Sequence, residues 1–222
     1  MTHPLPVSIE ISLCVLTINQ GRLAVLASRN TESNVWAFPG CPLAGLESCD
    51  DVAELLLLSH KPQRETTFLE QLRTYGPRAG RDGAGLLSVA YVALVADLHS
   101  RSQSSTTRVF ALDDLAGSGF LADEQERILA DGVERVRSKL EYTTAATSLV
   151  TEPFTIPELR RVYESVWGVA LHPANFRRKV LTTPGFVERI TNAENERGPE
   201  LYRRGTAQLL HPAMLRPTET TA

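Results

Sequence analysis

Cysteine is scarce in this sequence, and its scarcity excludes two kinds of stabilisation. The three cysteines are Cys14, Cys41 and Cys49. An odd number without CxxC spacing supports neither a disulfide framework nor a zinc site. Cys14 lies inside an apolar run, so we expect it to be a small core residue.

Long hydrophobic runs are also absent. The longest uninterrupted run, VAYVALVA, covers Val89–Ala96, whereas a membrane-spanning helix needs about 20 apolar residues. The opening residues MTHPLPVS contain no basic stretch followed by an apolar one, so we expect no signal peptide. With 42% hydrophobic residues the chain can bury a core, and we expect a soluble, cytoplasmic protein.

Positive charge is modest overall but concentrated in one segment. The formal net charge is −3, which by itself argues neither for nor against nucleic-acid binding. Residues 1–140 contain 13 Lys and Arg against 17 Asp and Glu, whereas residues 173–205 contain seven Lys and Arg against four Glu. A short basic segment behind an acidic body indicates two functions on one chain.

Residues 1–142 predict a mixed α/β domain. Val7–Ile18 and Leu23–Arg29, rich in β-branched residues and joined by the turn NQGR, predict a β-hairpin. Glu47–His60 predicts a helix with Ser48 as its N-cap. Further strands are predicted at VWAFPG, FLEQLRTYG, LLSVAYVALVAD and RVFALDDL, and a second helix at Asp123–Tyr142.

The composition changes after this helix. Residues 143–150 are small and polar and predict a linker, and residues 151–222 form the second predicted domain. Here Phe154–Gly168 predicts a helix capped by Thr155 and ended by a glycine. A turn, a basic helix at 173–182 and a hairpin follow, which is the order of a winged helix-turn-helix. The tail HPAMLRPTETTA is expected to be mobile.

The stretch WAFPGCPLAGLES resembles the entrance to the active site of Nudix hydrolases, which cleave pyrophosphates. Such hydrolysis needs divalent metals held by carboxylates, which a helix can present on one face. Aligned on this motif, Cys41 takes its glycine position and Glu47 its first glutamate. The catalytic run then falls on Leu55, Leu56, Leu57, Leu58, Ser59 and His60.

No metal-binding carboxylate of that run is left in this sequence. The acids one turn earlier, Asp50, Asp51 and Glu54, could act in their place, but acids in the first turn of a helix also simply favour its dipole. We therefore expect no catalytic residue, no metal site and no enzyme activity.

The resemblance extends over residues 7–204. The segments FLEQLRTYGPRAGRDGAGLLSVAYVAL and NFRRKVL resemble, in this order, the Nudix-related transcriptional regulators of NAD metabolism, the NrtR family. The resemblance implies an α+β fold, in which a Nudix-like α/β/α sandwich with a mixed sheet precedes a C-terminal winged helix-turn-helix. It also implies a bacterial, nucleoid-associated repressor of NAD biosynthesis or salvage genes. ADP-ribose or a related NAD metabolite would be its effector, and no cofactor would be required.

The resemblance places this effector in the Nudix cleft. Such a ligand needs cations or backbone N–H groups for its phosphates and a flat group against its adenine. The candidates are Arg29, Phe38, Gly40, Tyr75, Arg78 and Arg81, with Tyr75 as the stacking partner. The alternative for each arginine is a solvated surface charge.

The basic segment fits a recognition helix and a wing. Cations bind phosphates, and the N-terminal residues of a recognition helix read base edges in the major groove. Asn can pair with adenine and Arg with guanine, while Phe176 and Val180 can face the core. The predicted DNA contacts are Asn175, Arg177, Arg178, Lys179, Arg189, Arg197, Arg203 and Arg204. The alternative is a small helical domain with a solvated basic face.

Double-stranded operator DNA and a second copy of the chain are the expected macromolecular partners, because a pseudo-palindromic operator matches a two-fold dimer. Coupling between effector and DNA is expected to pass through Asp123–Tyr142 and the segment up to Val150. Two rival functions stay open. One is a divergent Nudix pyrophosphohydrolase that uses unusual carboxylates, and the other is a Nudix-like regulator of sugar metabolism.

Overall fold

The computed structural model describes residues 6–29, 35–60, 68–80, 84–98, 106–115, 119–190 and 198–217. The N-terminal elements are β1 Val7–Asn19, β2 Arg22–Arg29, β3 Trp36–Ala37, β4 Gly40–Pro42, α1 Cys49–His60, β5 Phe68–Ala79, β6 Gly85–Leu94, β7 Thr107–Ala111, α2 Leu112–Leu115 and α3 Asp123–Tyr142. They are followed by the 3₁₀ helix η1 Thr144–Leu149, α4 Ile156–Trp167, α5 Pro173–Thr182, β8 Val187–Ile190 and β9 Leu201–Arg204.

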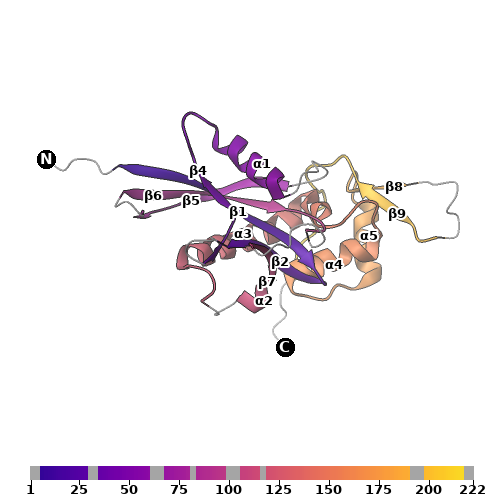
Figure 1. Cartoon of the computed structure of the whole chain (residues 1–222). Helices are drawn as coiled ribbons and strands as arrows, with labels where there is room; N and C mark the ends of the chain where they lie inside the picture. Colours follow the sequence, from indigo (N-terminus) through magenta and orange to yellow (C-terminus); the bar gives the residue numbers. More distant parts are fainter. Residues whose placement is uncertain are drawn as a thin grey trace.

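Strand β1 is the centre of a mixed sheet (Figure 1). The strand order is β3-β2-β1-β6-β5, with β4 also paired to β1 and β7 to β2. β1 runs parallel to β6 and antiparallel to β2. A strand covered on both faces carries a continuous apolar run rather than an alternating one, and residues 11–17 of β1 are all buried.

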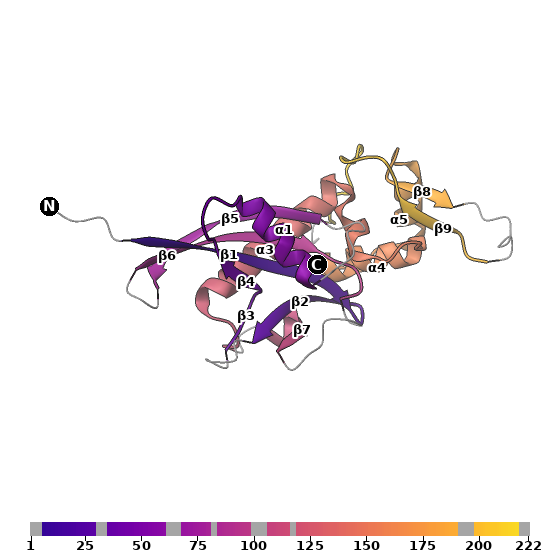
Figure 2. The same cartoon turned by 45° about the horizontal axis from the view of Figure 1, so that its top comes forward.

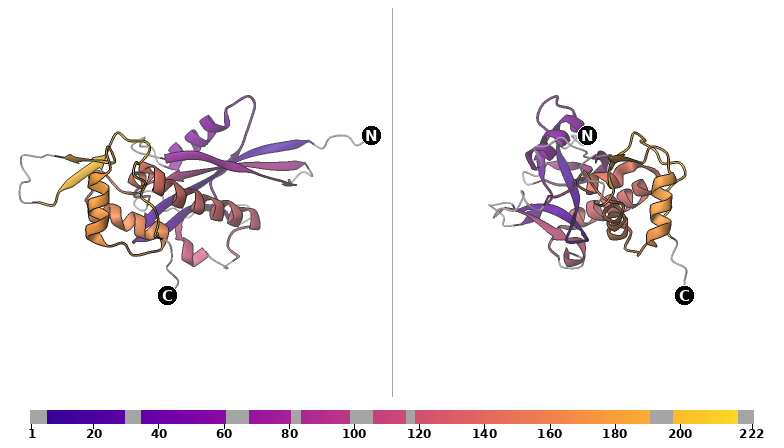
Figure 3. Two further views of the ribbon diagram at one scale, coloured as in Figure 1. Left: turned by 180° about the vertical axis from the view of Figure 1, so that it is seen from behind. Right: turned by 90° about the vertical axis from the view of Figure 1, so that its right-hand side faces the viewer.

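The sheet is sandwiched between two helices. On one face, Val52, Ala53 and Leu57 of α1 pack with Ile11 and Leu13 of β1 (Figure 2). On the other face, α3 packs against the side chains that point the opposite way from β1 and β6 (Figure 3). The predicted α/β/α sandwich with a mixed sheet is therefore confirmed.

The segment after α3 has the predicted order of a winged helix. Helix α4 begins with a capping box, in which the Glu158 N–H donates to Thr155 Oγ1 and the Glu158 carboxylate accepts from the Thr155 N–H. It ends at Gly168, whose φ of 71° suits a residue without a Cβ. Helix α5 follows, and β8 and β9 form a two-stranded antiparallel wing.

The two predicted domains share one hydrophobic core. Leu140 of α3, Leu149 of η1 and Tyr163 of α4 belong to the same buried cluster. All six residues of η1 are buried, and Tyr163 Oη donates to the Leu140 carbonyl at 3.1 Å. The segment predicted as a linker, residues 143–150, thus lies between the two packing units as a buried helix.

The tail departs from its prediction as far as the structure describes it. Leu210 and Met214 are buried, at 4% and 3% exposure. The Leu210 N–H donates to the Tyr142 carbonyl at 2.8 Å, and the Met214 N–H to the Glu141 carbonyl at 2.7 Å. The described part of the tail is therefore anchored to the end of α3 at Met214, a contact that no short-range pattern in the sequence indicates.

Several local predictions are confirmed. Cys14 is fully buried, and burial raises the pKa of its thiol to about 12. Helix α1 begins directly after Ser48, whose Oγ accepts from the Asp50 N–H at 3.2 Å. Within the described residues, no helix is long and apolar enough to cross a membrane.

Candidate functional site

Helix α5 divides its residues between the core and the surface. Phe176 and Val180 are buried, at 5% and 0% exposure. Because these two side chains fix the inner face of the helix, Asn175, Arg177 and Arg178 are exposed on the outer face. Phe176 and Val180 therefore face the core, as predicted, and the polar residues between and around them face outward.

Glu200 joins α5 to the wing. Its carboxylate accepts from Arg177 Nη2 at 2.5 Å and lies 3.1 Å from Arg189 Nη2. Tyr202 Oη donates to the same carboxylate at 3.0 Å. The hydrogen bond from Arg177, followed by that from Tyr202, lowers the pKa of Glu200. Two predicted DNA contacts, Arg177 of α5 and Arg189 of the wing, therefore share one acid that the sequence analysis did not single out.

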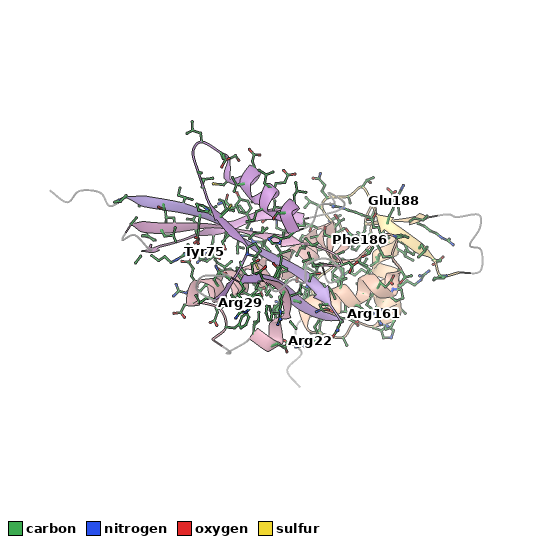
Figure 4. The ribbon with its side chains drawn as sticks, in the orientation of Figure 1. Arg22, Arg29, Tyr75, Arg161, Phe186 and Glu188 are labelled. Atoms are coloured by element: carbon green, nitrogen blue, oxygen red, sulfur yellow. The ribbon has the colours of Figure 1, made fainter. Side chains whose placement is uncertain are left out.

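The remaining predicted DNA contacts differ in their partners. Arg203 pairs with Glu188 across the wing at 2.9 Å. Figure 4 shows Glu188 far from Tyr75, on the side of the molecule that carries the wing. The backbone N–H of Arg204 donates to Glu152 at 2.8 Å. For Arg178, the described residues supply no carboxylate partner. Arg197 lies outside the described residues.

A second candidate site is a cavity of about 770 Å³ between β5 and the start of α3. The strand contributes residues 73–78, and α3 and the residue before it contribute Ala122–Gln125 and Arg127. Two of the predicted effector contacts, Tyr75 and Arg78, are among these lining residues.

Arg78 already faces two carboxylates in this cavity. Its Nη2 donates to Glu10 Oε1 at 2.6 Å, and its Nη1 donates to Glu124 and to Ser88 Oγ. Ser88 Oγ in turn donates to Glu10 Oε1 at 2.9 Å. A phosphate that binds Arg78 would therefore compete with Glu10 and Glu124 for the same guanidinium.

Tyr75 is buried at 6% exposure. Its Oη donates to Asp131 Oδ2 at 2.8 Å, and the Arg73 guanidinium lies 4.9 Å from the centre of its ring. Burial, then the hydrogen bond to Asp131, raises the pKa of the phenol, so Tyr75 stays protonated at neutral pH. Its accessible ring face is already taken by a cation, which leaves adenine stacking dependent on movement of Arg73.

The other predicted effector contacts lie on the strands around β3. The Phe38 N–H donates to Gln125 Oε1 at 2.7 Å, which ties this strand segment to the cavity wall. A Cβ at Gly40 would lie 2.9 Å from the Ile11 carbonyl oxygen, so the close strand approach excludes a side chain there. The Arg29 guanidinium lies 5.9 Å from the ring of Trp36. Arg81 lies outside the described residues.

Helix α1 carries the leucines that align with the catalytic run of the Nudix hydrolases. Leu57 is buried at 4% exposure, whereas Leu55 is 65% exposed. Asp50, one turn earlier, accepts a hydrogen bond from Tyr91 Oη. Among the residues that the structure describes, no group of three or more His, Cys, Asp or Glu side chains could hold a metal ion.

The helix, turn, basic helix and wing now have a counterpart among known families. Residues 146–204 match the model of the NrtR DNA-binding winged helix domain. The matched range begins inside η1 and ends at the last residue of β9. The NrtR match thus covers the last four residues of η1 and both strands of the wing.

Relatives that match most of the chain agree with this result. The ADPR responsive transcriptional repressor NtrR of Acinetobacter baylyi is 27% identical over 214 residues, which is 90% of this chain and 83% of the relative. The crystal structure of Shewanella oneidensis NrtR superposes with a TM-score of 0.73 at 22% identity, covering 89% of this chain and 94% of that chain. A MutT/nudix family protein from Enterococcus faecalis superposes with a TM-score of 0.71 at 20% identity, over 92% and 89% of the two chains.

These comparisons confirm the predicted resemblance to NrtR-type regulators and the predicted fold. The roles of individual residues stay predictions. What the structure adds is their grouping, since Tyr75 and Arg78 line one cavity whereas Arg177 and Arg189 meet at Glu200.

Proposed function

We propose that this chain is a transcriptional repressor of NAD biosynthesis or salvage genes, which binds operator DNA and responds to ADP-ribose or a related NAD metabolite. The observation that carries the proposal is the match of residues 146–204 to the NrtR DNA-binding winged helix domain. The responsive part rests on the Acinetobacter baylyi relative, which is an ADPR responsive transcriptional repressor.

In this proposal α5 enters the major groove and the wing lies along the backbone. Asn175 and Arg178 are exposed on the outer face of α5 and read base edges. Lys179, Arg189, Arg203 and Arg204 bind phosphates. Glu200 holds Arg177 and Arg189 together before DNA arrives, and a phosphate can take its place because the ion pairs are exposed.

The effector occupies the cavity between β5 and α3. The described residues give Arg127, which is exposed in the cavity wall, no carboxylate partner, so it is the cation most accessible to a phosphate. Arg78 becomes a second one when it exchanges Glu124 for the ligand. This exchange would loosen the contact between β5 and the first turn of α3.

Helix α3 connects this cavity to the winged helix. Its 20 residues span about 30 Å, with the first turn in the cavity wall. Near the other end, Arg137 Nε donates to the Val166 carbonyl at 3.0 Å, and Trp167 Nε1 donates to the Arg137 carbonyl at 3.2 Å. A ligand that prefers one position of α3 would thereby favour one position of α4 and α5.

The chain acts as a homodimer and not as a hydrolase. A two-fold dimer places two recognition helices on a pseudo-palindromic operator. The leucines at the aligned catalytic positions supply no ligand oxygen, so the ligand is retained as a signal rather than cleaved. In this proposal, binding takes place in the cytoplasm, on the nucleoid.

The deciding test is fluorescence anisotropy on labelled DNA from upstream of NAD biosynthesis genes in the same genome, at fixed salt, followed by titration with ADP-ribose. We expect tight binding that ADP-ribose reverses. Arg127→Ala should keep DNA binding and weaken the ADP-ribose response about tenfold, because a charge-assisted hydrogen bond contributes about 1.5–3 kcal/mol. Arg108→Ala, on β7 beside the Trp36 ring, is the matched control.

Three outcomes would contradict the proposal. Binding no tighter than to random DNA would remove the operator function at these genes. Multiple turnover of ADP-ribose in Mg²⁺ or Mn²⁺ would favour the rival hydrolase. Release by a sugar rather than by ADP-ribose would point instead to a regulator of sugar metabolism.

A further inference from the structure

The winged helix contains a cavity to which the proposed function assigns no role. It measures about 350 Å³ and lies between the first turns of α4 and α5. Ile156 and Pro157 come from α4, and Pro173, Ala174 and Phe176 come from α5. These five lining residues have hydrocarbon side chains. Most of the cavity wall is therefore apolar and favours an apolar group over a polar one.

The cavity has a fixed shape because the turn between the two helices is cross-linked. Arg160 Nη1 donates to the Leu171 carbonyl at 3.2 Å. The Leu171 N–H donates to Glu164 Oε1 at 2.8 Å, and Glu164 lies 3.8 Å from Arg160 Nε. Helix α4 therefore holds the start of α5 through both charged side chains, and the opening between the helices is preformed.

The cavity lies beside the residues that are proposed to read DNA. Ala174 precedes the predicted base reader Asn175, and Arg177 of the same helix also lines the cavity. Pro173 and Ala174 are exposed in the first turn of α5, which is the part of a recognition helix that meets base edges. The cavity is thus continuous with the proposed DNA-reading face and carries two arginines, Arg160 and Arg177, beside its apolar wall.

The major groove presents only one apolar group. Guanine, cytosine and adenine show donors and acceptors there, whereas thymine also shows its 5-methyl group. We propose that the cavity between α4 and α5 receives the 5-methyl group of one thymine in each operator half-site, with Pro173 and Ala174 as the contacting residues. Asn175 then reads an adenine in the same or the adjoining A·T pair.

This inference rests on the proposed DNA-binding function, but it is tested separately. Operator DNA is first selected from a random duplex library with the full chain. Each thymine is then replaced singly by deoxyuridine, which removes the methyl group and keeps the base pair. We expect one position in each half-site at which affinity falls about fourfold, and about 16-fold when both are replaced, as the loss of one buried carbon group predicts.

A protein variant locates the contact. Ala174→Ser puts a hydroxyl against the methyl group and should abolish the preference for thymine over deoxyuridine at that position. Ala130→Ser, at an exposed position of α3, is the matched control and should keep the preference. The deoxyuridine scan itself uses the unaltered protein, so it does not depend on how the variant folds.

Three outcomes would overturn the inference. Specific binding with no thymine that differs from deoxyuridine would exclude a methyl contact and leave the proposed function standing. A deoxyuridine effect that persists unchanged in Ala174→Ser would assign the methyl group to another part of the protein. Selection of no sequence from the library would overturn both the cavity assignment and the proposed function.

Discussion

The arginines at the two ends of the molecule face different partners. On α5, Arg177 is 48% exposed and shares one carboxylate, Glu200, which is 34% exposed. In the cavity, Arg78 is 36% exposed and faces two carboxylates, of which Glu124 is only 18% exposed. Exposed single pairs contribute little and exchange readily, whereas partly buried networks hold structure together. We therefore propose that the same residue type serves recognition at one end and cohesion at the other.

Removing Asn175 and Arg178, the proposed base readers, should have the largest effect. In the double variant Asn175→Ala/Arg178→Ala, specific DNA affinity should fall about 100-fold, because each side chain that reads a base contributes about 1–3 kcal/mol. Anisotropy on selected operator DNA measures this loss. Arg127→Ala, at the other end of the molecule, should bind the operator normally. An equal loss in both proteins would mean that the two ends do not differ in function.

Removing Arg78 should affect stability rather than DNA binding. Arg78→Ala leaves Glu10 and Glu124 close together without a cation, and because the group is partly exposed we expect about 1–2 kcal/mol less free energy of unfolding. Urea unfolding followed by circular dichroism measures the change. Arg178→Ala should stay within about 0.5 kcal/mol of the wild type. Equal stability of the two variants would refute the cohesive role of the network.

Neutralising Glu200 should strengthen DNA binding modestly. Glu200→Gln removes a negative charge from the DNA-facing side and releases Arg177 and Arg189. We expect about threefold tighter binding at low salt, and a slope of log K against log salt that is steeper by about one. Binding unchanged at every salt concentration would show that neither arginine reaches a phosphate.

The smallest expected effect concerns pH. The Arg177 guanidinium and the Tyr202 hydroxyl lower the pKa of Glu200 below its usual value of 4.5. Because the pKa of Glu200 is lowered in the folded protein, the Glu200–Arg177 pair is fully formed at pH values above 4.5. The pair is lost only as the pH falls through the lowered pKa. The affinity ratio of Glu200→Gln to wild type should thus stay constant between about pH 5.5 and 8. A ratio that narrows within this range would contradict the pKa shift.

Local patterns were sufficient for the secondary structure of the winged helix. The capping box at Thr155, the left-handed Gly168 and the four-residue spacing of Phe176 and Val180 all appear where the sequence indicates them. These signals lie within a few residues of one another, so no distant segment is needed to interpret them. The tail was not predictable in this way, since Met214 has its partner Glu141 far away in the chain.

The sequence by itself determined the order of elements and the position of the basic segment, because each depends on neighbouring residues. Only the tertiary structure decided which arginines are paired with carboxylates and which are accessible to a phosphate. Glu10 meets Arg78 from 68 positions away and Glu124 from 46, and Glu200 meets Arg177 from 23. Such pairs form when separate strands and helices pack into one core, and no periodic pattern records them. The same packing created both cavities, which exist only between elements that the chain brings together by folding.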